Sequence, residues 1–193
     1  EITVKMKNLF ITLEGVDGTG KSTVTKLLAE AIGGVSISTP PISSKLERLL
    51  IEKSDDQSQK FKFYIDQLVK QQQQIENLLK DQHVVCDRYT HSTFAYNWED
   101  HQPLPPSINN YIKNIKIPDY SFLLIADGVI REDRVKKREI ITGKINIADH
   151  NYLIIERARG RFNKMDELIS IDTNEKTPQD VCEELKSLVL KLK

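Results

Sequence analysis

The sequence predicts an α/β protein in which helices flank a five-stranded parallel sheet. Short apolar runs alternate with longer segments of helical periodicity, which is typical of a parallel sheet. The first apolar run leads directly into a glycine-rich segment, and a helical pattern follows it. The chain has 193 residues, 39% hydrophobic and 29% charged, as expected for one globular domain. It contains no internal repeat and no linker, so we expect residues 1–193 to form a single domain.

Five apolar runs predict the strands. Each has four to seven residues and is rich in aliphatic, β-branched and aromatic side chains. The predicted strands are Leu9–Leu13, Val35–Ser38, His83–Asp87, Tyr120–Ala126 and Leu168–Asp172.

Four further segments have the spacing of amphipathic helices. The first stops at Gly33-Gly34, a common C-terminal signal. The second is expected to turn Leu46, Leu49 and Leu50 toward the core. The predicted helices are Lys21–Ile32, Ser43–Glu52, Phe61–Lys80 and Thr177–Leu192, and the proline-rich Asp100–Ser107 is predicted to be a loop.

Charge and composition exclude several classes of partner. The 28 basic residues balance the 28 acidic residues, which argues against nucleic acid polymers and anionic membranes. The longest central apolar stretch, Phe122–Ala126, is far shorter than a membrane span of about 20 residues. Cys86 and Cys182 lack metal-ligand spacing and lie in apolar surroundings, so we expect buried thiols in a cytoplasmic, reducing compartment.

The glycine-rich segment from Gly15 to Ser22 satisfies the pattern G-x-x-x-x-G-K-[ST]. In such a loop, successive backbone N–H groups converge on phosphate oxygens at the start of the following helix. Lys21 would reach the β- and γ-phosphates of ATP, and the Ser22 hydroxyl would bind Mg²⁺. No N-K-x-D base reader is present, which excludes a guanine-nucleotide switch protein. The predicted nucleotide-binding residues are Gly15, Asp17, Gly18, Thr19, Gly20, Lys21, Ser22 and Thr23.

Three segments together resemble the thymidylate kinase superfamily of nucleoside monophosphate kinases. They are Phe10–Thr23, the D-R-Y-x-x-S-x-x-A-Y segment Asp87–Tyr96, and Pro118-Asp119 before an apolar strand. Thr39-Pro-Pro41, Phe63-Tyr64 and Tyr89–Ser92 also resemble the mitochondrial UMP-CMP kinase branch. The resemblance implies a three-layer P-loop NTPase fold with a small lid, phosphoryl transfer from ATP to a pyrimidine monophosphate, and a homodimer.

Asp87 ends an apolar strand, so its carboxylate should emerge at the sheet edge where α/β proteins bind ligands. There it could hold Mg²⁺ together with Ser22, as acids at strand ends do in P-loop enzymes. The adjacent Arg88 offers several N–H donors to phosphate oxygens. Taken alone, the pair would more often be a structural ion pair, but beside the P-loop we interpret both residues as functional.

Arg131, Arg134 and Arg138 are spaced to share one face of a helix. Such a charged run is usually a solvated helix, but the superfamily places lid arginines here, over about residues 131–151. Gly18 stands where some members carry a P-loop arginine, so the lid should supply the catalytic cation. We predict that Arg134 and Arg138 are catalytic with Lys21 and Arg88, and leave Arg131 open. The segment 140–151 offers only Lys144 as a further lid cation.

The resemblance also locates the acceptor nucleotide. Asp17 would contact the sugar and Phe63 would stack on the base. Spacing alone fits a turn aspartate equally well, and an aromatic in an apolar helix such as Phe63 is more often a core residue. Gln67 replaces an arginine that reads thymine, and an amide could recognise thymine, uracil or cytosine. The predicted acceptor residues are Asp17, Thr39, Arg48, Phe63, Gln67, Arg88, Ser92, Tyr96 and Asn97. The acceptor is therefore expected to be dTMP, with a UMP/CMP or dUMP/dCMP kinase, or a catalytically weak P-loop module, as alternatives.

Overall fold

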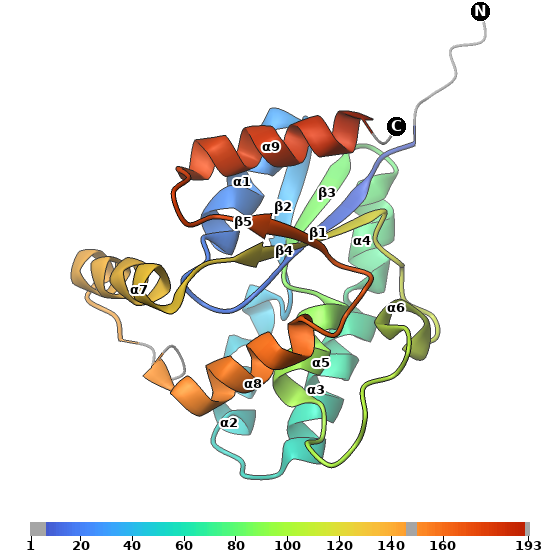
Figure 1. Cartoon of the computed structure of the whole chain (residues 1–193). Coiled ribbons are helices and arrows are strands. Elements are labelled where there is room, and N and C mark those ends of the chain that lie inside the picture. The colour runs from blue at the N-terminus through green and yellow to red at the C-terminus, as the bar shows by residue number, and fades with distance from the viewer. Residues whose placement is uncertain (1–6, 146–149, 192–193) are drawn as a thin grey trace, which may run out of the picture.

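A computed structural model describes residues 7–145 and 150–191 and contains a five-stranded parallel sheet (Figure 1). The strand order is β2-β3-β1-β4-β5, which places the strand before the glycine-rich loop at the centre. The strands are β1 (Phe10–Glu14), β2 (Gly34–Ser38), β3 (His83–Asp87), β4 (Tyr120–Ile125) and β5 (Ile169–Asp172). The predicted fold class is confirmed, and each predicted strand lies within one residue of its observed bounds.

Helices cover both faces of the sheet and so complete three layers (Figure 1). On one face, α1 (Lys21–Ala31) and α9 (Pro178–Lys191) pack over a core that includes Leu28 and Leu185. Four helices cover the other face, namely α3 (Gln57–Lys70), α4 (Gln72–Leu79), α5 (Thr90–Asn97) and α8 (Tyr152–Phe162). The remaining elements are a short 3-10 turn (Ile42–Ser44), α2 (Lys45–Ile51), α6 (Ile108–Tyr111) and α7 (Gly128–Thr142), the helix that projects from the body.

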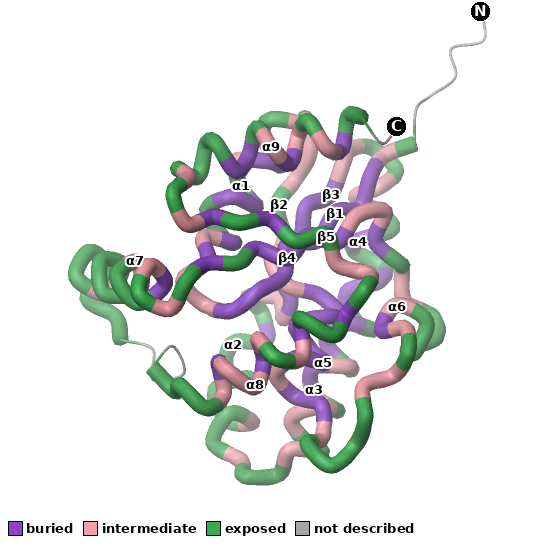
Figure 2. The backbone as a smooth tube through the Cα atoms, in the orientation of Figure 1, coloured by how far each residue is buried: buried purple, intermediate pink, exposed green. Residues whose placement is uncertain are grey.

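The central strand β1 is buried along its whole length (Figure 2). Because side chains alternate along a strand, Ile11 and Leu13 join the core beneath α1 and α9, whereas Phe10 joins the core beneath α3 and α4. Glu14 shares the second face with Phe10 and is fully buried. The alternation of side chains along β1 therefore places the Glu14 carboxylate beneath α5, one residue before the glycine loop.

The predicted single helix Phe61–Lys80 is wrong, because two helices, α3 and α4, meet at Gln71. The Gln71 side chain is buried and bonds to the last residue of β2 and to the residue after it. Its Oε1 accepts from Thr39 Oγ1 at 2.6 Å, and its Nε2 donates to the Ser38 carbonyl at 2.9 Å. The glutamine tract is thus interrupted by a tertiary contact, to which helical periodicity is insensitive.

The expectation that α2 turns its leucines inward is also wrong. Leu46 and Leu50 are 77% and 71% exposed, and Leu49 is 53% exposed. Apolar spacing identified the apolar face of this helix correctly, but α2 lies away from the sheet and nothing in the described chain covers that face (Figure 2). Within residues 7–145 and 150–191, no helix is both long and apolar enough to cross a membrane.

Candidate active site

The glycine-rich loop has the backbone of a phosphate cradle. Gly15, Gly18 and Gly20 adopt φ of +134°, +85° and +94°, a region that residues with a Cβ rarely enter. A Cβ on Gly15 would lie 2.5 Å from the Leu124 carbonyl oxygen, so this position also requires the missing side chain. Thr19 Oγ1 donates to the Val16 carbonyl at 2.9 Å, which closes the loop on itself. Ser22 and Thr23 are exposed at the start of α1, beside the loop.

Lys21 is only 5% exposed, and its Nζ donates to the Val16 carbonyl at 2.7 Å. Burial and the charge of Arg88 together lower the pKa of Lys21 to about 8, against the attraction of nearby carboxylates, which acts to raise it. The ammonium is therefore folded over the loop, with little solvent around it. An anion placed in the cradle would relieve the cost of burying this charge.

Ser22 and Asp87 meet across the edge of the sheet. Ser22 Oγ donates to Asp87 Oδ2 in a short hydrogen bond. The other carboxylate oxygen, Oδ1, is buried and makes no hydrogen bond within the described residues. A hydroxyl beside a carboxylate with a free oxygen suits Mg²⁺. This ion usually binds only one or two protein side chains and completes its coordination with water and substrate phosphate oxygens. The described residues contain no cluster of three His, Cys, Asp or Glu side chains for a metal.

Arg88 links the end of β3 to the glycine loop. Its Nη2 donates to Asp17 Oδ1 at 2.8 Å, and its guanidinium lies 4.8 Å from the centre of the Tyr96 ring. Burial acts to raise the pKa of Asp17, but the charges of Arg88 and Lys21 hold it well below its usual value. Burial likewise acts to lower the pKa of Arg88, which Asp17 raises well above its usual value. The carboxylate and the guanidinium therefore stay charged at neutral pH.

Helix α7 packs directly on the glycine loop through Arg131. A Cβ on Gly18 would lie 2.5 Å from Arg131 Cγ and 2.7 Å from the Arg131 carbonyl oxygen. Arg131 is 5% exposed, and its Nη1 lies 3.5 Å from the Asp17 carbonyl oxygen. This helix thus fills the space that a P-loop arginine at position 18 would need, which gives a packing reason for the glycine.

The two other arginines of α7 point to different places. Arg134 binds the chain beyond β5, with Nη1 donating to Thr173 Oγ1 at 2.9 Å and Nη2 to the Thr173 carbonyl at 2.5 Å. Arg138 is exposed, and its charge contributes to the lowered pKa of Asp17. Arg138 therefore acts electrostatically on the site, whereas Arg134 ties α7 to the sheet. A catalytic role for either residue stays a prediction, and residues 146–149 of the expected lid lie outside the described chain.

The predicted acceptor residues lie on several elements. Thr39 is buried against Gln71 and Cys86, and Arg48 is half-exposed near Glu52 on α2. Phe63 on α3 is half-buried and packs edge-on against Tyr64. The structure brings together Asp17, Lys21, Ser22, Asp87, Arg88 and Tyr96. Gln67, Ser92 and Asn97 are buried on α3 and α5.

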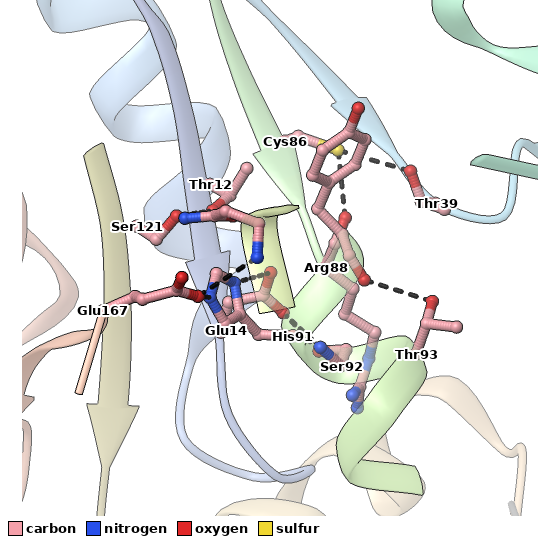
Figure 3. Close-up of polar contacts among 12 residues, drawn as sticks. Thr12, Glu14, Thr39, Cys86, Arg88, His91, Ser92, Thr93, Ser121 and Glu167 are labelled. Atoms are coloured by element: carbon pink, nitrogen blue, oxygen red, sulfur yellow. Dashed lines mark hydrogen bonds and ion pairs between the residues drawn. The ribbon is translucent and has the colours of Figure 1, made fainter. Parts of the chain in front are cut away.

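Sequence reasoning missed a buried network beside this site (Figure 3). Glu14 Oε2 accepts from the Ser92 backbone N–H at 3.0 Å, and His91 Nε2 lies 3.0 Å from Glu167 Oε2. Glu14 and His91 are both 0% exposed. One signal was available: Glu14, like Asp87, is an acid at the carboxyl end of an apolar strand. Nothing in the sequence pointed to Glu167, which lies between α8 and β5.

Comparison with known proteins agrees with this geometry. The model of the thymidylate kinase family matches residues 13–185. The probable thymidylate kinase of Methanocaldococcus jannaschii is 32% identical over 187 residues, covering 92% of this chain and 94% of that protein. The probable thymidylate kinase of Methanococcus maripaludis strain S2 is 30% identical over 197 residues, covering 95% and 96%.

Solved structures show the same fold. The thymidylate kinase of Candida albicans superposes with a TM-score of 0.70 at 20% identity, covering 96% of this chain and 92% of that chain. The thymidylate kinase of Ehrlichia chaffeensis superposes with a TM-score of 0.60 at 22% identity, covering 95% and 100%. With its P-loop NTPase fold and a family match over most of its length, this chain belongs to the thymidylate kinase family of nucleoside monophosphate kinases.

Proposed function

We propose that this protein transfers the γ-phosphoryl group of ATP to dTMP, giving dTDP and ADP. The observation that carries the proposal is the pairing of Arg88 with Asp17 at 2.8 Å, beside the buried Lys21. It joins the phosphate cradle to the D-R-Y segment, so a donor and an acceptor nucleotide could meet at one point. Family membership and relatives named thymidylate kinase support dTMP as the acceptor.

The attacking group is an anionic phosphate oxygen, so the reaction needs no strong general base. The chain's task is to align two anions and neutralise their charge. Lys21 and the loop N–H groups would hold the donor phosphates, while Arg88 would hold the acceptor phosphate. Asp17, kept anionic by Arg88, would accept a hydrogen bond from the sugar hydroxyl. Arg138, on the exposed side of α7, would bring the remaining positive charge.

Mg²⁺ would be held by Ser22 and Asp87, whose free buried Oδ1 fits a hard cation. When bound, the ion would neutralise part of the charge on the phosphate oxygens. Because Arg88 follows Asp87 directly, the acceptor phosphate that it would bind lies at the same edge of the sheet as the ion. The compartment we propose is the cytoplasm, in agreement with two cysteines that are buried and free.

A steady-state screen of dTMP, dUMP, UMP, dCMP and CMP with ATP and Mg²⁺ tests the proposed reaction. We expect dTMP to give the highest kcat/KM. Lys21→Ala should lower kcat by roughly 100-fold or more, because it removes charge from a water-poor site. Lys26→Ala, on the exposed side of α1, is the matched control and should retain full activity. Turnover of every monophosphate at background level, or an active Lys21→Ala enzyme, would contradict the proposal.

We also propose a homodimer formed through α2. Ile42, Leu46, Leu49 and Leu50 form an α2 apolar patch in which each side chain is at least 53% exposed. The family resemblance implies a homodimer, and the exposure of this patch supports α2 as its interface, because a second copy of the chain would remove these side chains from water. Sedimentation velocity should show a dimer that Leu46→Asp converts to a monomer, whereas Leu190→Asp on α9 should not.

A further inference from the structure

The buried residues Glu14, His91 and Glu167 form a chain of carboxylate, imidazole and carboxylate that the phosphoryl transfer itself does not use (Figure 3). His91 Nε2 lies 3.0 Å from Glu167 Oε2, and Nδ1 lies 3.7 Å from Glu14 Oε1. His91 and Glu14 are 0% exposed, and the Glu167 side chain is 23% exposed. Two carboxylates cannot share so dry a space cheaply unless a positive charge lies between them.

Glu14 connects this chain to the start of α5. Its Oε2 accepts from the Ser92 backbone N–H at 3.0 Å and, in a short hydrogen bond, from Ser92 Oγ. Ser92 is the third residue of α5, so a carboxylate from β1 caps the N-terminus of that helix and is stabilised by its dipole. The Arg88 backbone N–H donates to the Leu13 carbonyl at 2.9 Å. The segment carrying Arg88 is therefore attached twice to the end of β1.

Glu167 connects the same chain to α6. It accepts from the Asn109 backbone N–H at 3.2 Å and from Ser107 Oγ in a short hydrogen bond. His91 thus lies between a carboxylate that precedes the glycine loop and a carboxylate that anchors α6 beside α5. We call Glu14, His91 and Glu167 the buried clamp.

We propose that His91 is a positioning residue, which as an imidazolium draws Glu14 and Glu167 together and so fixes Arg88 relative to the glycine loop. The inference rests on the proposed kinase function, because Arg88 is the group that would hold the acceptor phosphate. When His91 loses its proton, Glu14 and Glu167 repel each other and the start of α5 moves away from β1. Alignment of the two phosphates then suffers, and misplacement of about 1 Å can cost on the order of 100-fold in rate.

The electrostatic surroundings support a charged imidazole. Burial acts to lower the pKa of His91, but the carboxylates of Glu14 and Glu167 raise it above its usual value. Helix α5 itself carries no other charged side chain. Helix α8, which packs on α5, contributes Arg157 and Arg161, whose guanidinium groups donate to the Tyr96 and Ala95 carbonyls farther along α5. Lys21 is coupled electrostatically to the clamp, because the charge of Glu14 acts to raise the pKa of Lys21.

The first test compares pH profiles of kcat at saturating ATP and dTMP. Glu167→Gln keeps the shape of the side chain and, through its amide oxygen, can still accept from His91 and Asn109, but it removes one charge beside His91. Its amide nitrogen would donate to Ser107 Oγ instead of accepting from it. This variant should move the alkaline limb of the profile about one pH unit or more toward lower pH, with near-normal activity restored in acid. Glu99→Gln is the matched control, because Glu99 pairs with the exposed His101 at 3.2 Å. Its profile should coincide with that of the unmodified enzyme.

The second variant, His91→Gln, should lower kcat about tenfold or more and leave the KM for ATP within about twofold, since alignment rather than binding is lost. NMR titration of the His91 imidazole in the unmodified protein follows the clamp without turnover and separates it from Lys21. The imidazole should be protonated at pH 7 and should titrate at lower pH in Glu167→Gln.

The clamp is refuted by a neutral His91 at pH 7 in the unmodified protein, by unchanged pH profiles in Glu167→Gln, or by full kcat in His91→Gln. A protein that shows the expected titration but turns over no monophosphate would refute the proposed reaction, and the positioning role with it, while leaving the clamp's electrostatics established. These results distinguish a failure of the clamp from a failure of the function.

Discussion

Replacement of Gly18 by alanine should reveal how tightly α7 packs on the glycine loop. A φ of +85° costs an L-residue about 1–2 kcal/mol. The new Cβ would also lie 2.5 Å from Arg131 Cγ and 2.7 Å from the Arg131 carbonyl oxygen. The carbonyl belongs to the helix backbone, so α7 must shift, at a further cost of about 1–3 kcal/mol. The expected loss of unfolding free energy is therefore about 2–5 kcal/mol.

Gly20→Ala is the matched control, because Gly20 has a φ of +94° but no atom within 4 Å of the position of a Cβ. Gly20→Ala should lose only the unfolding free energy that the unfavourable backbone φ costs, about 1–2 kcal/mol. In a chain of this length 1 kcal/mol corresponds to about 2–4 °C, so Gly18→Ala should melt roughly 2–12 °C below Gly20→Ala. Thermal unfolding followed by circular dichroism without nucleotide measures the difference. Equal melting temperatures for the two variants would refute the packing of α7 on the loop.

Two more predictions concern the core and the buried carboxylates. Leu185 and Leu190 lie on the same helix, α9, at 0% and 58% exposure. Leu185→Ala should therefore lose about 2–5 kcal/mol of unfolding free energy in urea, and Leu190→Ala less than about 1 kcal/mol. Burial acts to raise the pKa of Glu14, but His91 and Ser92 hold it below its usual value of 4.5. Its contribution to stability is therefore present above pH 4.5 and is lost as the pH falls through the lowered pKa. Urea unfolding between pH 3 and 6 should show this loss, and Glu14→Gln should flatten it; a slope equal to that of the unmodified protein would contradict the prediction.

Much of the fold could be predicted from the sequence, because the patterns that indicate its strands and its glycine loop are local. The five strands are buried apolar runs, and the glycine loop identifies itself by its spacing. Asp87 could be placed at the ligand-binding edge because it ends such a run. Helix α5 gave no helical signal because seven of its eight residues are buried, which leaves no polar face to create a period.

The buried network beside the site and the break between α3 and α4 could not be predicted because both depend on contact between distant segments. Ser92 and Glu14 are 78 residues apart, and His91 and Glu167 are 76 apart. Gln71 interrupts a helix because of Thr39, 32 residues earlier. Spacing could place three arginines on one face of α7, but it could not show that Arg131 packs on Gly18.

The bond between α7 and the end of β5 affects the order in which the protein can mature. Thr173 Oγ1 accepts from Arg134, donates to the Ile125 carbonyl at 2.9 Å, and lies 3.4 Å from the Thr19 carbonyl, 154 residues earlier. The ribosome therefore synthesises the glycine loop among the first residues of the chain, but it synthesises Thr173, which supports that loop, only near the end. A nascent chain that ends before β5 has the loop sequence without the strand and the Thr173 hydroxyl that hold it, so we expect nucleotide to be captured only late in synthesis.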